Sequence, residues 1–208
     1  MKIVLLGAPA SGKGTQVGLL SNHFNLTHIS TGDIFRDILK TNNDLSKEVE
    51  QYLLNGLLVP DDLTFSLVKQ KLSKQDTLNN FLLDGFPRNI NQAELLKTFT
   101  DIDYAIYIDL DFETLVSRCL NRKVCPSCKK IFIKTEHNSE NCDVCGEKLI
   151  MRADDNREIK LKQYEEFKKE TYPLVSYYET LGKLIIVNGN DTKENIFKFI
   201  KSKIENND

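Results

Sequence analysis

A glycine-rich segment near the start of the chain constrains the fold more than any other feature of the sequence. Residues 7–15 read GAPASGKGT and lie between an apolar run at residues 3–6 and a segment with helical spacing. In such a loop, small residues let backbone N–H groups converge on phosphate oxygens, and the following helix adds partial positive charge. A lysine at this position reaches the outer phosphates. The segment therefore predicts a strand, a phosphate-binding loop and a helix, with Lys13 as the cation that contacts phosphate.

The loop departs in one place from the commonest phosphate-loop pattern. Gly14 follows the lysine where Ser or Thr usually ligates Mg²⁺, so the hydroxyl is displaced to Thr15. This departure favours a kinase that acts on a small molecule over a GTPase. The alternative interpretation is a glycine-rich turn without a ligand, and the lysine with its flanking strand and helix argues against it.

The rest of the chain alternates short apolar runs with longer segments of helical periodicity. We expect buried strands at residues 3–6, 28–30, 81–84, 105–110 and 184–187, and helices that include 15–24, 32–39, 63–72, 92–98 and a closing amphipathic helix at 192–204. This alternation predicts an α/β doubly wound domain with its ligands at the carboxyl ends of the strands. The length of 208 residues suits one core with an inserted subdomain.

A second group of polar residues follows the third predicted strand, where residues 84–88 read DGFPR. Asp84, at the end of a buried strand beside the phosphate loop, fits either a carboxylate that holds the water shell of Mg²⁺ or the cap of a turn. Arg88 offers bidentate contacts to a second phosphate. Upstream, residues 30–33 (STGD) with Arg36 place another arginine at a capping turn, and capping is a common use of these residue types by itself.

Four of the five cysteines form two Cys-x-x-Cys pairs with thirteen residues between them. They are Cys125, Cys128, Cys142 and Cys145. In a reducing compartment this spacing indicates zinc before disulfides, and four thiolates close a tetrahedral shell, which suits a structural site. His137 lies between the pairs and is left out of the ligand set, because four sulfurs complete the shell. Cys119, in a stretch of helical character, is expected to be a buried small hydrophobe.

The charge balance and the hydropathy exclude two kinds of partner. There are 28 basic and 30 acidic side chains, which argues against nucleic acid as the main partner. No apolar stretch approaches the length that spans a bilayer, and the N-terminal apolar run is too short for a signal sequence. We therefore expect a cytoplasmic protein that binds neither nucleic acid nor membrane.

Together these motifs resemble adenylate kinase, of the long bacterial type with a zinc-bearing lid. The resemblance rests on residues 7–15, 30–33 and 84–88 and on Arg152-x-Asp154-Asp155, and it runs in order from Met1 to about Ile200. It implies reversible, Mg²⁺-dependent phosphoryl transfer from ATP to AMP, which gives two ADP. The implied protein is a monomer that uses Mg²⁺ with ATP and holds a structural Zn²⁺.

The resemblance also implies a fold and its division into parts. The fold is α/β, a P-loop three-layer fold with a five-stranded parallel sheet, a helical monophosphate-binding insert and a small zinc-ribbon-like lid. The core would comprise residues 1–29, 61–121 and 156–208, the AMP-binding insert residues 30–60, and the zinc-binding lid residues 122–155.

The same resemblance assigns site residues to three groups. ATP would be bound by Ala10, Ser11, Gly12, Lys13, Gly14, Thr15, Arg118, Arg122, Ile131 and Phe132. AMP would be bound by Thr31, Arg36, Leu57, Leu58, Val59, Gly85, Phe86, Pro87, Arg88, Gln92 and Arg152. Catalysis would rest on Lys13, Arg36, Arg88, Arg122 and Arg152, with Asp154 and Asp155 locking the closed lid or positioning charge there, and Asp84 would hold Mg²⁺ through water.

Two positions depart from the pattern that the resemblance implies. Ala10 stands where glycine is usual, and because alanine tolerates only a negative φ comfortably, we expect a slightly re-shaped loop. Gln163 falls where a phosphate-binding arginine is implied, and a neutral amide brings no charge to the transition state. Lys160 lies three residues earlier on the same helical face and is expected to compensate, whereas Lys162 points about 100° away.

Other functions stay open at this point. A kinase for UMP or CMP, or one that uses GTP, is a near neighbour, although Thr31 and Gln92 favour adenine and the long lid disfavours the pyrimidine enzymes. A different class is a zinc-ribbon RNA-binding or regulatory protein that retains an inactive kinase fold. Residues 122–152 carry seven basic and four acidic side chains, an excess that fits a lid over ATP at least as well as RNA.

Overall fold

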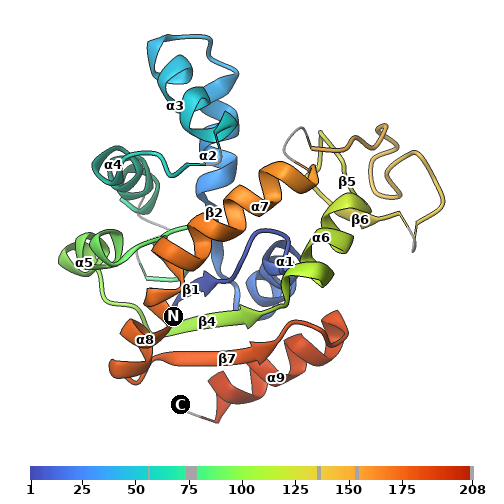
Figure 1. Ribbon diagram of the computed structural model, residues 1–208. Helices are drawn as coiled ribbons and strands as arrows, with labels where there is room; N and C mark the ends of the chain where they lie inside the picture. Colours follow the sequence, from blue (N-terminus) through green and yellow to red (C-terminus); the bar gives the residue numbers. More distant parts are fainter. Residues whose placement is uncertain (56, 74–78, 135–136, 153–154, 207–208) are drawn as a thin grey trace.

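The computed structural model describes residues 1–55, 57–73, 79–134, 137–152 and 155–206. A five-stranded parallel sheet forms its centre, with helices on both faces (Figure 1). The strands, in the spatial order β2-β3-β1-β4-β7, are β2 Thr27–Ser30, β3 Phe81–Asp84, β1 Lys2–Leu6, β4 Tyr104–Asp109 and β7 Leu184–Asn188. All five predicted strands are confirmed, each within one residue of the expected ends.

The central strands β1, β3 and β4 are largely apolar because both faces of the sheet are covered there. Along β1, Ile3 and Leu5 belong to one buried cluster and Val4 and Leu6 to the other. The first cluster includes side chains of α1 and α9, and the second includes side chains of α4, α5, α6 and α8. Alternate side chains of a strand point to opposite faces, so a strand between two helical layers buries both sets. The doubly wound arrangement follows.

Nine α-helices surround the sheet within the described part of the chain. They are α1 Lys13–Phe24, α2 Thr31–Leu39, α3 Asp44–Leu54, α4 Asp61–Leu72, α5 Ile90–Phe99, α6 Phe112–Leu120, α7 Arg157–Glu166, α8 Pro173–Thr180 and α9 Lys193–Glu205, with a short π-helical turn, η1 Phe167–Thr171, between α7 and α8. The five expected helices begin within two residues of their predicted starts. None of the helices described is both long enough and apolar enough to cross a membrane.

Six of these helices begin at a polar residue whose side chain accepts a hydrogen bond from the backbone N–H three residues later. The six capping residues are Ser30, Asn43, Asn89, Asp111, Asn156 and Thr192. A side-chain acceptor at this position satisfies one of the amides that the first helical turn leaves without a partner. The caps place the start of α2 directly after the carboxyl end of β2, and the start of α5 after a short loop, residues 85–89, that follows β3.

Two segments extend from the sheet. Helices α2 and α3 stand above it in Figure 1 and enclose a small cluster of their own that contains Phe35, Val49 and Val59. The cysteine-bearing segment contains an antiparallel pair, β5 Arg122–Val124 and β6 Ile131–Ile133, in which Lys123 is opposite Phe132. Between residues 122 and 155 the described part of this segment contains no helix.

Candidate active site and metal centre

The phosphate loop joins the carboxyl end of β1 to α1. Gly12, with φ 103°, is the residue before the helix, and Lys13 is the first residue in it. The Lys13 ammonium donates to the carbonyl oxygens of Gly7 and Ala8, at 2.7 Å and 2.9 Å. These contacts hold the ammonium against the loop backbone, beside the helix N-terminus whose N–H groups favour anions.

The cysteine-bearing segment packs on this loop. A Cβ atom at Gly14 would lie 3.0 Å from Cδ1 of Ile131, in β6. A Cβ atom at Gly12 would lie 3.9 Å from Nη1 of Arg118, in α6. The structure therefore brings together Gly12, Gly14, Arg118 and Ile131, and it supplies a physical reason for glycine at position 14: a side chain there would press on Ile131.

Ala10 adopts a left-handed conformation with φ 65°. The loop is thus not re-shaped to give this alanine a negative φ, and that expectation from the sequence is wrong. The left-handed region costs a residue with a Cβ atom about 1–2 kcal/mol relative to the right-handed one. The loop keeps a glycine-like backbone path, and the alanine carries the strain.

Three residues predicted to bind AMP, Thr31, Gly85 and Arg88, lie together at the carboxyl ends of β2 and β3. The Thr31 hydroxyl donates to the carbonyl oxygen of Gly85 at 2.9 Å, and Nε of Arg88 donates to the same oxygen at 2.9 Å. Gly85 has φ 83°, and a Cβ atom there would lie 2.6 Å from the Thr31 hydroxyl oxygen, which only glycine avoids. The contact between the motif at residues 30–33 and the motif at residues 84–88 therefore depends on a glycine at position 85.

Arg36 lies in the last turn of α2 and pairs with Asp33, Nη2 to Oδ1 at 2.8 Å. Both side chains are exposed, at 42% and 41%. An exposed pair of this kind contributes at most about 1 kcal/mol. A phosphate dianion can therefore compete with Asp33 for the guanidinium.

Gln92 is buried, and both ends of its amide are engaged. Its Oε1 accepts from the backbone N–H of Arg88 at 2.8 Å, and its Nε2 donates to Oδ1 of Asp61 at 2.7 Å. Burial raises the pKa of Asp61, but hydrogen bonds from Asn91, Gln92 and Asn89 outweigh it and bring the pKa below its ordinary value. An ionised carboxylate only accepts, so Asp61 fixes which end of the Gln92 amide faces it.

Asp61 is not among the site residues that the sequence predicts. It lies in the first turn of α4, directly after Pro60, where acidic residues commonly favour the helix N-terminus. No sequence signal distinguished this role from the contact with Gln92, because the contact joins two helices that are 31 residues apart in the chain.

A buried ion pair connects Arg122 of β5 with Asp155, which lies two residues before the start of α7. Nε of Arg122 donates to Oδ2 of Asp155 at 2.8 Å, and Nη2 donates to Oδ1. The Asp155 side chain is fully buried. Burial raises its pKa, but the hydrogen bonds and charge of Arg122 outweigh this effect, and the pKa lies below its ordinary value. The bidentate pair holds Arg122 in one orientation.

Cys119 is buried, as predicted, but it is more than a small hydrophobe. Its Sγ donates to Oδ1 of Asp155 at 3.0 Å. Burial and this hydrogen bond raise the pKa of the thiol to about 12. The thiol therefore remains protonated and acts as a donor to the buried carboxylate.

Lys160 and Gln163 lie on one face of α7, as predicted, and their side chains are hydrogen bonded. Nζ of Lys160 donates to Oε1 of Gln163 at 2.8 Å and lies 3.4 Å from Oδ1 of Asp155. The pKa of Lys13 is lowered to about 8, chiefly by burial, and the carboxylate of Asp84 opposes this effect. The charges of Arg88, Arg122 and Lys160 contribute to the lowering. Cations from three separate segments thus act on the lysine of the phosphate loop.

The remaining candidates divide into buried and accessible positions. Phe86 is 1% exposed and stacks on Phe65, with ring centroids 6.3 Å apart. Val59 and Phe132 are also buried, whereas Leu57 is 50% exposed. The buried side chains pack in the protein, so any ligand contact at these positions would involve the backbone. Arg152 is half-buried, and Asp154 lies outside the described residues.

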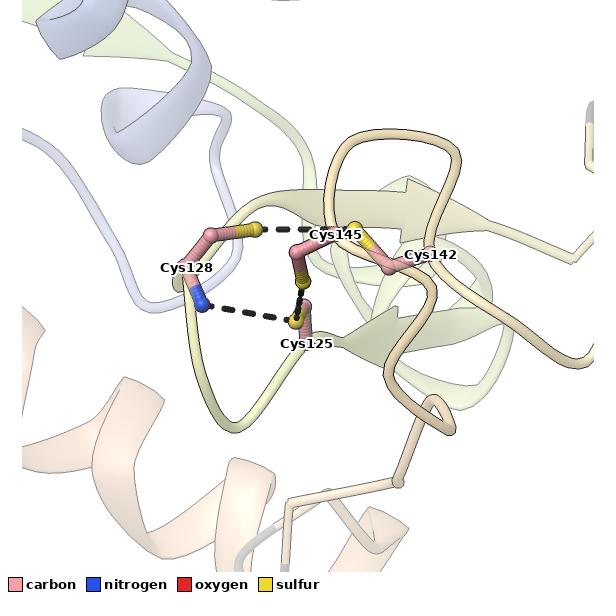
Figure 2. Close-up of side chains that lie close together, drawn as sticks. All are labelled: Cys125, Cys128, Cys142 and Cys145. Carbon is pink, nitrogen blue, oxygen red and sulfur yellow. Dashed lines mark hydrogen bonds between the residues drawn. The ribbon is translucent and has the colours of Figure 1, made fainter.

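Figure 2 shows the four clustered cysteines with their sulfur atoms turned toward one another. All four Sγ atoms lie within 4.8 Å of each other, with Cys125 and Cys145 at 3.4 Å and Cys128 and Cys142 at 3.5 Å. A Zn–S bond of about 2.3 Å places tetrahedral sulfurs roughly 3.8 Å apart. The four residues therefore fit a zinc ion with four thiolate ligands.

The two cysteine pairs lie in turns of the same construction. The Cys125 carbonyl accepts from the N–H of Lys129, and its own N–H donates to the carbonyl of Lys130. Cys142 makes the equivalent bonds with Gly146 and Glu147. The fifth residue of each turn is left-handed, with φ 64° at Lys129 and 75° at Gly146. Each turn brings its two sulfurs to one side, which is what a shared ion requires.

His137 does not join the four sulfurs. Its Nε2 lies 3.0 Å from the carbonyl oxygen of Asn141, and its ring packs on Phe132 with centroids 4.4 Å apart. These contacts give the histidine a packing role beneath the turns, in agreement with its exclusion from the predicted ligand set.

A phosphate loop, a second arginine-bearing site at the neighbouring strand and a cysteine-rich segment over the loop define a P-loop phosphotransferase. The family model named Adenylate kinase matches residues 5–183. Curated adenylate kinases of Thermoanaerobacter sp. (strain X514) and Thermosipho africanus (strain TCF52B) are 42% and 44% identical, over 98% and 91% of this chain and 98% and 92% of theirs. One from Clostridium perfringens (strain SM101 / Type A) is 40% identical over 96% of both chains. The chain belongs to the adenylate kinase family.

Proposed function

We propose that the protein transfers a phosphoryl group reversibly from ATP to AMP, with Mg²⁺, to form two ADP. The observation that supports this proposal is that the two candidate phosphate-binding groups follow the carboxyl ends of neighbouring strands. Lys13 follows β1, and Arg88 follows β3, and these two strands are neighbours in which Leu5 is opposite Asp84. Two nucleotides bound at these sites would meet with their phosphates between the strands.

The donor site would bind the ATP phosphates through the backbone N–H groups of residues 10–15 and the ammonium of Lys13. Arg118 and Arg122 would lie beside the nucleotide, and Ile131 and Phe132 would cover it. The contact of Ile131 with the loop at Gly14 supports this arrangement. Bound Mg²⁺ would neutralise phosphoryl oxygens, and Asp84 would hold its water shell.

The acceptor site would bind AMP between α2 and the carboxyl end of β3. Arg36 and Arg88 are the cations for its phosphate, and Thr31 with Gly85 forms the wall between them. The adenine would lie against residues 57–59 and Gln92, with Phe86 and Pro87 contributing backbone. The fixed orientation of the Gln92 amide supports selection of one base.

Transfer would proceed in line, without a covalent intermediate. The protein's contribution is to position the two nucleotides and to neutralise the charge that spreads over the phosphoryl oxygens. Lys13, Arg36, Arg88, Arg122 and Arg152 supply that charge in this proposal. Asp154 and Asp155 hold the covering segment closed, and the bond of Asp155 to Arg122 supports this role.

Residues 122–155 act as a lid, residues 30–60 as the AMP-binding insert, and residues 1–29, 61–121 and 156–208 as the core. A lid of about thirty residues buries little apolar surface, so a structural Zn²⁺ on the four cysteines would supply its rigidity. The buried side chains of its own cluster are Cys125, Phe132, Cys142 and Leu149, two of them ligands. We further propose that the protein acts as a cytoplasmic monomer.

A coupled assay of ADP formation with ATP as donor tests this function, with AMP, UMP, CMP and GMP as alternative acceptors. We expect turnover with AMP at least a hundredfold above the other three. Preference for UMP or CMP would move the protein to another nucleoside monophosphate kinase. Absence of turnover with every acceptor, together with tight binding of RNA, would refute the enzymatic proposal.

A further inference from the structure

The two arginines proposed to bind the AMP phosphate have different partners in the structure. Nε of Arg88 donates to the carbonyl oxygen of Gly85, which is a neutral acceptor. Nη2 of Arg36 donates to the carboxylate of Asp33, with Oδ1 at 2.8 Å. Arg36 therefore already has an anionic partner before any nucleotide binds.

The first turn of α2 holds the Arg36 guanidinium in this position. The backbone N–H of Asp33 donates to the hydroxyl of Ser30 at 3.3 Å, which fixes the turn that carries the carboxylate. A Cβ atom at Gly32 would lie 3.2 Å from both Nη1 and Nη2 of Arg36. The glycine thus gives the guanidinium room to fold back along the helix, three residues from its own position, onto Asp33.

This ion pair lies beside the proposed acceptor site. Gly32, on which the guanidinium rests, follows Thr31, and the Thr31 hydroxyl donates to the same Gly85 oxygen that Arg88 binds. A phosphate that takes Arg36 from Asp33 must break the pair and approach a second negative charge. Both effects reduce the affinity of the site for an anion.

We propose that Asp33 is a positioning residue that limits the strength of AMP binding: it holds Arg36 in the empty site and takes it back when the nucleotide leaves. Asp33 acts through Arg36. Since the pair is exposed, a phosphate can displace the carboxylate, and the site still binds. The benefit is faster release of nucleotide, because product release limits the rate of many enzymes. This inference rests on the proposed function and adds the residue that sets affinity at the acceptor site.

The test compares Asp33→Asn with Asp37→Asn, one turn further along the same helix. Asp37 pairs with Lys40 at the same spacing, Oδ1 to Nζ at 2.7 Å, so both substitutions remove one negative charge and one exposed ion pair from α2. Calorimetric titration with AMP at low salt measures affinity. We expect Asp33→Asn to bind AMP about three- to fivefold more tightly. Asp37→Asn should change the affinity by less than half that factor.

Adenosine separates the effect on phosphate from an effect on the rest of the site. It has no phosphate and gains nothing from a released Arg36, so its affinity should be the same in Asp33→Asn and in the unmodified protein. Asp33→Glu keeps the carboxylate and should bind AMP as the unmodified protein does. In steady-state kinetics, KM for AMP should fall in Asp33→Asn while KM for ATP stays unchanged.

Thermal melting of each variant confirms that it is folded, and Asp33→Ser replaces Asp33→Asn if the asparagine variant does not fold. An affinity of Asp33→Asn for AMP that is equal to or weaker than that of the unmodified protein would overturn the inference, because Asp33 would then not compete with phosphate. An equal gain in affinity for adenosine, or an equal gain in Asp37→Asn, would also overturn it.

Turnover is measured separately from binding. A protein that binds AMP but forms no ADP from ATP and AMP would refute the proposed function. The comparison of AMP with adenosine would still decide the role of Asp33.

Discussion

Ile131 packs directly on Gly14, with Cδ1 3.0 Å from the position that a Cβ atom on Gly14 would occupy. This contact joins β6 of the cysteine-bearing segment to the first turn of α1. The two residues are 117 positions apart in the chain and meet only in the fold. Their contact links the proposed lid to the proposed triphosphate site, and it leads to the first prediction.

Gly14→Ala should push Ile131 away from the loop and raise KM for ATP several-fold, with a smaller effect on KM for AMP. Gly18→Ala is the matched control, because nothing lies within 4 Å of a Cβ atom there. The control should stabilise α1 by about 1 kcal/mol through helix propensity. Combining Gly14→Ala with Ile131→Ala should restore KM for ATP. A KM that stays high in the double variant would show that Ile131 does not contact the loop when ATP binds.

Lys13 gives a prediction on pH. Its pKa of about 8 in the folded protein lies below the ordinary value of 10.5. Between these two pH values the unfolded chain binds more protons than the folded one, so the free energy of unfolding should rise with pH across this window. In Lys13→Met this contribution should vanish, and turnover should fall by several orders of magnitude. Urea unfolding at pH 8 and pH 10 measures the free energy of unfolding. The same change with pH in the unmodified protein and in Lys13→Met would contradict the prediction.

Ala10→Gly should stabilise the protein by about 1 kcal/mol, because glycine adopts φ 65° without the penalty that alanine bears. The greater freedom of glycine in the unfolded chain reduces this gain. Ala8→Gly serves as the control, since Ala8 is buried and does not have a positive φ, and that change should be destabilising. Melting temperatures test this prediction. A melting temperature of Ala10→Gly below that of the unmodified protein would contradict the assignment of strain to Ala10.

The four cysteines should hold one Zn²⁺ per chain. Elemental analysis of protein purified under reducing conditions measures the content, and chelation should lower the melting temperature because metal binding stabilises the folded segment. Cys128→Ser should lose zinc, whereas Cys119→Ser should keep it, since Cys119 contacts Asp155 rather than the cluster. Metal-free protein from the unmodified chain would defeat this prediction.

Asp61→Asn should relax the choice of acceptor base. An asparagine can donate as well as accept, so the Gln92 amide would no longer be held with its Nε2 toward residue 61. We expect the ratio of kcat/KM for AMP to that for GMP to fall by about tenfold, with KM for ATP unchanged. Asp62→Asn, at the neighbouring helix position, is the control, and an equal fall in both variants would indicate a helix-end effect.

The sequence alone determined the strands, the glycine-rich loop and the cluster of four cysteines. A strand buried on both faces must be apolar along its length, so the runs at β1, β3 and β4 were visible without any partner. The loop and the two Cys-x-x-Cys turns are local, because each is built from residues within about ten positions of one another. These features can therefore be recognised from short stretches of the sequence.

Only the tertiary structure decided which charges share a carboxylate and which atoms touch across segments. The bond of Asp61 to Gln92, the contact of Ile131 with Gly14 and the pairing of Arg122 with Asp155 each join residues at least 31 positions apart. Periodicity placed Lys160 beside Gln163, since both lie on one helix, but it could not show that Lys160 reaches Asp155. Such contacts depend on how the helices pack, and a polar residue has the same local signal whether it faces solvent or a buried ion.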